Sequence, residues 1–427
     1  MASATAEPLR AGRDVSRRRP SSRQPRTTPA TQRKTTSLRG LDWLNFFMAN
    51  VQTGFGPFIA VYLTSQRWTQ TDIGIALSVG TVTAMISQIP GGAVVDALPG
   101  KRIAAIFATL AIAGSALLFA VQPDKLQVFT AEILHGFASS VMTPAIAAIS
   151  LALVGRAALG ERLGRNASFA SIGNGLAAGV MGACGAYVSS RSVFILTAAL
   201  AIPAVFALRM IGPARVPRVP APEQGGALRG LATLFTDRRL LAFAACAMLF
   251  QLSDAAMLPI AAARATAQAG SAANLLIAAC IVVPQIVVAF LSPQIGRWAE
   301  TRGRRYVLLL GWGALPLRGV LMAIFPNAYA MVGLQALSGI SAATFGVMLP
   351  LISADVTRGT GRFNLVMGAL GLAVNIGATL STTMAGALAD HYGVRIAFLG
   401  LAGAGGLGTL LIWLTMPETR RRRRHRQ

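Results

Sequence analysis

Charged residues are scarce in this sequence of 427 residues, because Asp, Glu, Lys and Arg together make up only 13% of it. Acidic residues are rarer still, with 15 in the whole chain, whereas apolar residues account for 54%. A soluble domain of this length carries about twice that fraction of charged residues. The composition therefore argues against an ordinary soluble protein and favours one that lies in a lipid bilayer.

Cysteines and cofactor motifs are also sparse. The three cysteines, Cys184, Cys246 and Cys280, lie inside hydrophobic runs, without the spacing of a disulfide framework or a metal site. No Gly-x-x-x-x-Gly-Lys loop for nucleotide phosphates is present, and the connecting segments are too short for an added catalytic domain. We therefore expect no metal site, no cofactor, no catalytic residue and no ATP-driven pumping, and hence a protein that is not an enzyme.

Basic residues are the one abundant charged class, and they give the chain a net charge of +24. Of the 39 Lys and Arg, 10 precede Leu41, 6 follow Glu418 and 6 lie from Arg209 to Arg239. Basic clusters at the ends of hydrophobic runs indicate membrane topology and contact with anionic lipid rather than a nucleic-acid partner. We expect basic cytoplasmic tails at residues 1–38, which are poor in large apolar residues and so disordered, and at 418–427.

Twelve hydrophobic runs follow the first tail, each long enough to cross a bilayer. They cover residues 41–64, 72–96, 103–122, 126–153, 167–188, 192–211, 239–263, 272–296, 306–325, 328–353, 364–389 and 394–416. A Pro-rich and polar linker at 212–238 separates the first six from the last six. The sequence therefore predicts an all-α membrane protein whose twelve transmembrane helices form two six-helix bundles, at 39–211 and 239–417.

The basic residues also predict the orientation of the chain. With both termini in the cytoplasm, most Lys and Arg fall in cytoplasmic segments, as the positive-inside rule requires, and the number of helices is even. Abundant Ala, and a strong preference for Arg over Lys, are typical of a GC-rich bacterial genome. We expect a monomeric, multi-pass protein of the bacterial inner membrane.

Two segments at matching places in the two halves share one pattern, which is a glycine, three residues, an acid, and then a glycine and two bases. The copies are Gly92, Asp96, Gly100, Lys101 and Arg102, and Gly296, Glu300, Gly303, Arg304 and Arg305. A second repeat relates residues 132–139 to 335–342, and Gly-Arg-Asn at 164–166 has a counterpart at 361–364. The first two matches have separations of 203 or 204 residues, which indicates a duplicated chain.

The repeated segment resembles the signature loop of the major facilitator superfamily. The second copy differs from the family pattern at Glu300, where Asp is usual, and at Thr301, and the first copy differs more, with Ala97 in place of a base. The resemblance covers residues 40–416 and implies two bundles around a central cavity lined by helices one, four, seven and ten. It also implies secondary transport of a small solute, with the repeated loops acting as latches.

The first helix carries a narrower resemblance. Residues 54–58, Gly-Phe-Gly-Pro-Phe, are similar to a segment of drug-proton antiporters, although the fifth-helix Gly-Pro motif of that branch is absent. We therefore expect proton-coupled efflux of a small amphiphilic or cationic compound by an antiporter, ahead of uptake by a proton symporter. A membrane sensor that has this fold but transports nothing is the third hypothesis.

Three charged residues stand out deep inside hydrophobic runs, where each costs at least about 2.5–3.5 kcal/mol on insertion scales. Glu132 and Asp254 lie at a similar depth in the fourth and seventh runs, and each could take up and release a proton as the cavity opens to alternate sides. His135, one helical turn after Glu132, is expected to assist this proton coupling. Arg318 is expected to pair with another group or to reach the membrane surface. A structural bond between helices is the alternative role for each acid.

Six amides are candidates for hydrogen bonds to the solute or, alternatively, for hydrogen bonds between helices. They are Asn50, Gln52, Asn174, Gln251, Gln335 and Asn375. Pro259 predicts a bend in the helix just after Asp254. The acids have no match in the other half, because Gln335 stands at the position of Glu132 and Gln52 at that of Asp254. We therefore expect proton coupling to depend on these unmatched acids.

Overall fold

The computed structural model describes residues 29–55, 58–59, 62–63, 66–68, 70–98, 100–121, 124–212, 238–261, 273–358 and 362–416. These residues form helices and contain no strand, and eleven of their helical segments are long and apolar enough to cross a membrane. Together with the interrupted first helix, they confirm the predicted all-α fold. Residues 213–237 of the predicted linker at 212–238, residues 1–28 of the predicted tail at 1–38, and the whole predicted tail at 418–427 lie outside the described residues.

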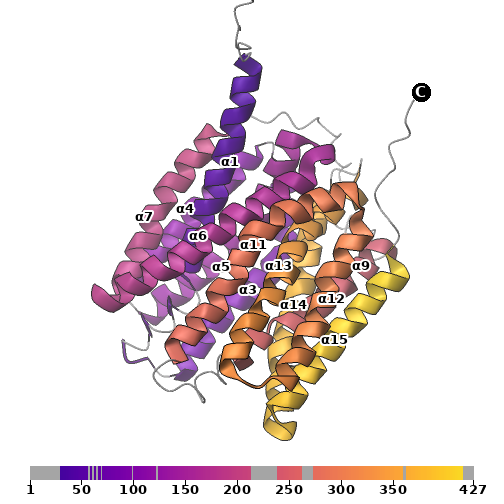
Figure 1. Ribbon diagram of the computed structural model, residues 1–427. Helices are drawn as coiled ribbons and strands as arrows, with labels where there is room; N and C mark the ends of the chain where they lie inside the picture. The colour runs from indigo at the N-terminus through magenta and orange to yellow at the C-terminus, as the bar shows by residue number, and fades with distance from the viewer. Residues whose placement is uncertain are drawn as a thin grey trace, which may run out of the picture.

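The two halves of the chain each contribute a group of long helices, which lie side by side in Figure 1. The first half contains α1 (Pro29–Thr53), α3 (Gln70–Ala97), α4 (Lys101–Val121), α5 (Lys125–Val154), η1 (Arg156–Ala158), α6 (Leu159–Tyr187) and α7 (Ser190–Met210). The second half contains α9 (Arg238–Asp254), α11 (Ala273–Thr301), α12 (Arg304–Ile324), α13 (Ala328–Val356), α14 (Phe363–Tyr392) and α15 (Val394–Thr415).

Both ends of the described chain lie at one end of the bundle, which we call the terminal end (upper end in Figure 1). There, the Ser37 hydroxyl near the start of α1 accepts a hydrogen bond from the Gly212 amide after α7 (3.0 Å). At the same end, Arg305 at the start of α12 donates to the Trp413 carbonyl near the end of α15 (2.6 Å). We call the opposite end, where α5 begins, the distal end.

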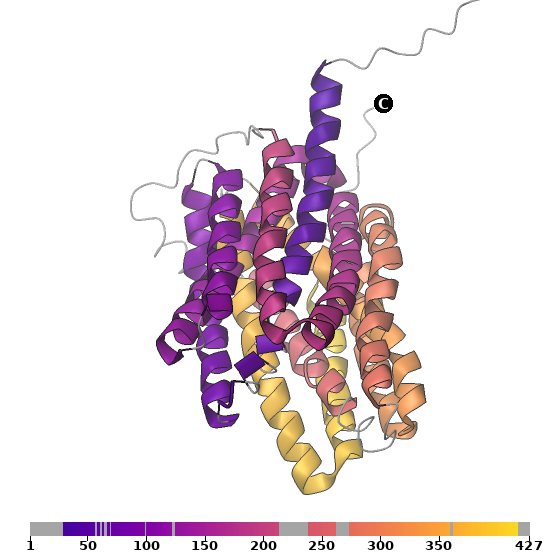
Figure 2. The ribbon, with the colours of Figure 1, turned by 90° about the vertical axis from the view of Figure 1, so that its left-hand side faces the viewer.

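The start of α1 corrects one prediction from the sequence. Residues 29–38, which we expected to be disordered, are helical, and the first turns of α1 project from the bundle (Figures 1 and 2). No Gly or Pro occurs between Pro29 and Gly40, so the backbone does not stop the membrane helix from continuing. Ser37 is buried and bonded to the end of α7. A contact with the end of α7 thus holds α1 at Ser37, and the turns before it continue the helix outside the bundle.

Apolar side chains pack inside each half and also join the halves. Ile112, Phe119 and Phe194 belong to a core within the first half. A second core in the other half, which includes Trp312, also takes in Leu159 of α6. Many large apolar side chains remain exposed on the outer surface, as expected where lipid is the solvent.

Helices α1 and α9 are interrupted at corresponding places in the two halves. α1 ends at Thr53 and is followed by a turn at residues 54–55. α9 ends at Asp254 and is followed by a turn at 255–256, after which the chain is helical again from 257 to 261. In transporters built from repeats, paired interruptions of this kind mark the place where the solute binds.

Candidate functional site

The break after Asp254 leaves backbone groups without their usual helical partners. Pro259 has no N–H, so the Ala255 carbonyl loses its partner four residues on. The freed Ala256 amide donates instead to the Ser381 hydroxyl of α14 (3.1 Å), and both residues are buried. The bend that Pro259 predicts is therefore confirmed, and α14 holds the broken helix in place.

Asp254 forms an ion pair with the buried Arg318 of α12. The Arg318 Nη1 lies 2.5 Å from the Asp254 Oδ1, and the side chains are 1% and 25% exposed, respectively. Arg318 also donates through Nη2 to the Gln335 Oε1 of α13 (3.0 Å). The Arg318 Nε has no hydrogen-bond partner among the described residues. The second half thus holds one charged network across three helices, with Asp254 as its most exposed member.

Glu132 has a different environment. Glu132 is 4% exposed, and its Oε1 has no hydrogen-bond partner among the described residues. The carboxylate packs against Gly80 of α3 so closely that a Cβ at that position would clash with the Glu132 Oε2. Within the part of the chain that the structure describes, this acid has no cation beside it.

His135 points to α1 rather than to Glu132. Its Nε2 lies 3.2 Å from the Gln52 Oε1, and its ring stacks on Phe55 with a centroid distance of 3.8 Å and an interplanar angle of 8°. Gln52 also donates to the Ser139 hydroxyl (3.2 Å). The role of His135 in proton coupling stays a prediction, and the contacts of His135 in this conformation are with Gln52 and Phe55 of the first helix region.

The other predicted amides have mixed positions. Asn50 is buried and donates to the Phe46 carbonyl of its own helix (2.8 Å), while the Asn174 Oδ1 accepts from the Thr53 hydroxyl (3.0 Å). Both therefore serve helix packing between α1 and α6. Gln251 and Asn375 are partly exposed, and Asn375 donates to the backbone of its own helix. Of the six amides, Gln52 and Gln335 bond to the titratable groups.

The first repeated acid, Asp96 at the end of α3, bonds across the two halves. Its Oδ1 accepts from the side-chain Nδ2 of Asn364 (2.6 Å) and from the backbone amide of that residue (3.3 Å). Its Oδ2 accepts from the Leu365 amide (2.9 Å). Asp96 thus caps the start of α14, whose unpaired amides and helix dipole favour a negative charge.

The second repeated acid, Glu300, makes the reciprocal contact. Its Oε1 accepts from the amides of Gly160 (2.8 Å) and Glu161 (3.3 Å) at the start of α6. Each half therefore caps the first turn of a helix in the other half. We call these contacts the Asp96 latch and the Glu300 latch.

The glycines that begin each copy of the repeat allow this close approach. A Cβ at Gly92 would clash with the Asn364 carbonyl, and one at Gly296 would clash with the Gly160 carbonyl. Nearer the distal end, a Cβ at Gly175, Gly179 or Gly182 of α6 would meet no atom within 4 Å. The hydrogen bonds that join the halves among the described residues lie toward the terminal end, so the structure is closed there.

The bases of the repeat act within their own halves. Lys101 donates to the carbonyls of Asp96 (2.9 Å) and Leu98 (3.1 Å), which caps the end of α3. Arg102 donates to the end of α7. In the second copy, Arg304 pairs with Asp355 of α13 (3.2 Å). The acids therefore join the halves, while the bases bond to helices of their own half.

A sequence profile described as Major Facilitator Superfamily matches residues 41–264 and 243–427 of this chain. The chain belongs to this superfamily. An uncharacterized MFS-type transporter of Mycobacterium tuberculosis (strain ATCC 25618 / H37Rv) is 35% identical over 393 residues, which cover 89% of this chain and 93% of that protein. The corresponding protein of strain CDC 1551 / Oshkosh gives the same values. This major facilitator is therefore a secondary transporter.

Solved structures of other transporters share the fold. The Escherichia coli fucose:proton symporter FucP has a TM-score of 0.71 at 17% identity, covering 89% of this chain and 98% of that one. The human organic anion transporter MFSD10 has a TM-score of 0.69 at 16% identity, with 89% and 99% covered. The nucleoside transporter NupG has a TM-score of 0.63 at 17% identity, with 89% and 100% covered. Identities this low show a common fold for this major facilitator and no common solute.

Several residues that organise this major facilitator gave little signal in its sequence. Gly80 and Ser381 are ordinary residues of apolar helices until the structure shows what they touch. The sequence analysis also did not select Asp42 and Arg162. Their positions could have been noticed, because Asp42 lies at the start of one hydrophobic run and Arg162 shortly before another. That these two residues pair with each other could not be predicted, because they are far apart in the sequence.

Proposed function

We propose that this chain couples the export of a small organic solute to proton entry, by alternating access across the bacterial inner membrane. The observation that carries the proposal is Glu132, a buried acid without a cation partner in a helix that crosses the membrane. An ionised carboxylate without partners is costly in such a place, so the neutral, protonated form is favoured there. When the cavity opens to the other side and water reaches Glu132, the proton can leave.

Asp254 takes a different part in this proposal from the one that we expected from the sequence. Asp254 already balances the charge of the buried Arg318, whereas Glu132 has no ion-pair partner among the described residues. We therefore assign the proton to Glu132 and give Asp254 the task of holding the broken helix α9 against α12. The partly exposed Asp254 and Gln251, beside the break, are then available to the solute.

The latches supply the alternating-access step of the proposal. With the terminal end facing the cytoplasm, the Asp96 and Glu300 latches close the inner side in this conformation. Releasing both would let the halves rock and expose Glu132 to the cytoplasm, where the proton concentration is lower. Residues 54–58, with their similarity to drug-proton antiporters, support export as the direction. Uptake by proton symport is the alternative. There the proton enters together with the solute, so the solute moves in the opposite direction and its binding takes up a proton instead of releasing one.

Proton release on solute binding tests this proposal. A panel of organic cations and neutral amphiphiles is first screened for thermal stabilisation of the purified protein, because a bound solute raises stability by RT ln(1 + [L]/Kd). The strongest hit is then added to the protein in unbuffered solution. For an antiporter, we expect solute to displace the proton from Glu132, so that the parent acidifies the solution by up to one proton per molecule and Glu132→Gln releases none.

Asp390→Asn is the matched control, because it neutralises an exposed acid of α14 and should release protons as the parent does. Proton uptake in place of release would indicate symport. Unchanged release by Glu132→Gln would exclude Glu132 as the carrier. Solute binding without any flux in proteoliposomes would favour the sensor hypothesis.

A further inference from the structure

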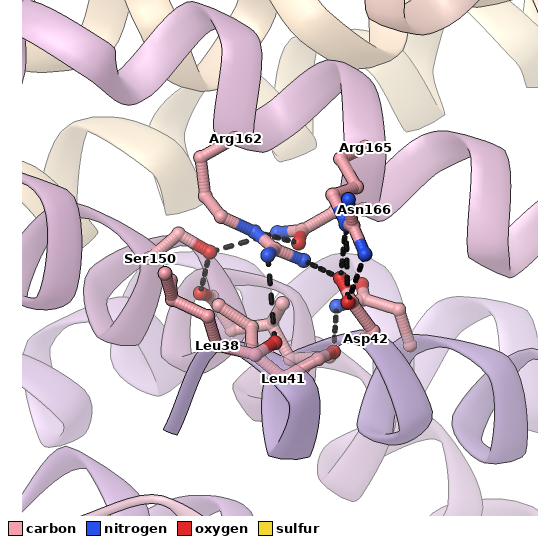
Figure 3. Close-up of polar contacts among 9 residues, drawn as sticks. Leu38, Leu41, Asp42, Ser150, Arg162, Arg165 and Asn166 are labelled. Carbon is pink, nitrogen blue, oxygen red and sulfur yellow. Dashed lines mark hydrogen bonds and ion pairs between the residues drawn. The ribbon is translucent and has the colours of Figure 1, made fainter. Parts of the chain in front are cut away.

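A buried ionic cluster ties the middle of α1 to the start of α6 (Figure 3). The Asp42 carboxylate of α1 accepts from the Arg162 Nη2 at 2.5 Å and from the Arg165 Nη2 at 2.7 Å. The Asp42 and Arg162 side chains are 5% and 4% exposed, whereas that of Arg165 is 56% exposed. One acid is therefore shared by two bases, and the inner pair is nearly dry.

Further hydrogen bonds fix the inner arginine in one orientation. Its Nε donates to the Asn166 Oδ1 (2.7 Å), and Asn166 in turn donates through Nδ2 to the Ser150 hydroxyl of α5 (2.8 Å). The Nη1 of Arg162 also faces the Leu38 carbonyl of α1 (3.5 Å). In Figure 3 these groups form one connected set that links α1, α5 and α6.

The cluster lies directly beside the Glu300 latch. The amides that Glu300 caps belong to Gly160 and Glu161, and the next residue along the chain is Arg162. The first turn of α6 is thus held from two sides, by Asp42 of its own half and by Glu300 of the other half. Asp42 and Glu300 share no contact, so any effect of one on the other must pass through this turn.

We propose that Asp42 is a positioning residue for the Glu300 latch, which it serves by fixing the first turn of α6 so that its amides face Glu300. A cap of two backbone amides requires that turn to be held in place, because amide direction follows the helix axis. The Asp96 latch is built differently. There, the side chain of Asn364 contributes a donor of its own, and Asp42 makes its ion pairs with α6 rather than with α14. Asp42 should therefore affect one latch and not the other.

A double-mutant cycle tests this difference. Spin labels are placed on the full-length protein at Ala157 and Arg358, exposed positions at the terminal end on opposite halves, after its three cysteines are replaced by alanine. Pulsed electron paramagnetic resonance then gives the ratio of the open to the closed terminal end. The variants are Asp42→Asn, Glu300→Gln and Asp96→Asn, each alone, and Asp42→Asn combined with each of the other two.

We expect each single variant to raise the open-to-closed ratio about tenfold, which corresponds to about 1.4 kcal/mol. Combining Asp42→Asn with Glu300→Gln should give no more opening than Glu300→Gln alone, within about twofold, because the latch that Asp42 positions is already lost. Combining it with Asp96→Asn should multiply the two effects to about a hundredfold. A merely structural role for Asp42 predicts the same multiplication with both partners, and that result would overturn the proposal.

Arg165→Gln provides a second route if Asp42→Asn does not fold. Arg165 is the exposed partner, so its loss leaves the buried pair of Asp42 and Arg162 intact. It should show a smaller opening with the same dependence on Glu300, and independence from Glu300 would overturn the proposal. The inference rests on the alternating-access part of the proposed function. If Glu300→Gln and Asp96→Asn themselves fail to open the terminal end, both the latches and the role of Asp42 are wrong.

Discussion

At the scale of single residues, two acids that look equivalent in the sequence have different roles because of their neighbours. Asp254 has Arg318 as an ion-pair partner, whereas Glu132 packs on a glycine. A carboxylate paired with a buried cation is needed to balance the charge of that cation. An unpaired carboxylate in an apolar site favours the neutral acid. The neighbour, and not the acid itself, therefore decides which of them carries a proton in our account.

Replacing Gly80 with alanine tests the environment of Glu132. The new Cβ would clash with the Glu132 Oε2, so the carboxyl group must move away from α3. Because small misplacements of a functional group can cost about a hundredfold in rate, we expect the initial rate of proton-driven solute flux in proteoliposomes to fall at least about tenfold.

Gly333→Ala on α13 is the matched control for that variant. A Cβ at Gly333 meets no atom within 4 Å, so this variant should transport at the parental rate. Equal flux in both variants would show that the position of the Glu132 carboxyl does not matter.

Much of the candidate site could be chosen from the sequence, because charged residues inside apolar runs stand out. The contacts of these residues could not be predicted from the sequence. Arg318 lies 64 residues from its partner Asp254, and spacing along one helix gives no information about such a pair. The spacing of Glu132 and His135 did suggest contact, but side chains on one face of a helix can turn to different neighbours, and His135 stacks on Phe55 instead.

At the scale of helices, proline and hydrophobicity predicted the middle of each element better than its ends. The apolar runs gave the positions of the helices, and Pro259 gave the break after α9. The start of α1 was predicted wrongly, because hydrophobicity marks the part of a helix that lies in lipid and not the polar turns that continue it. Of these polar turns, Ser37 contacts the end of α7.

Ser381→Ala tests how the break in α9 is supported. The variant removes the acceptor of the Ala256 amide and leaves a buried N–H unpaired. Such a loss costs about 1–3 kcal/mol, so we expect a lower midpoint of thermal unfolding in detergent. Thr382→Ala is the control, because its hydroxyl is exposed and bonds within its own helix. If the two variants unfold at the same temperature, another group must satisfy the Ala256 amide.

At the scale of the whole molecule, duplication accounts for the framework, and the differences between the copies account for the chemistry. The latches obey the repeat, since each half caps a helix of the other half through an acid at the same place. The membrane-embedded charges are not repeated in the two halves, because the residue that corresponds to Glu132 is the uncharged Gln335. In our account, the symmetric framework can thus move between two conformations, while one unmatched acid, Glu132, carries the proton during that movement.

Comparing driven transport with exchange in Glu132→Gln tests this account most directly. Proteoliposomes that are acidic inside are given the solute found by the stabilisation screen, and accumulation is measured beside solute exchange at equal pH. The parent should do both. Because rocking needs only the latches and the solute site, Glu132→Gln should exchange solute within about twofold of the parent and should not accumulate it. Accumulation by Glu132→Gln at the parental level would contradict the account.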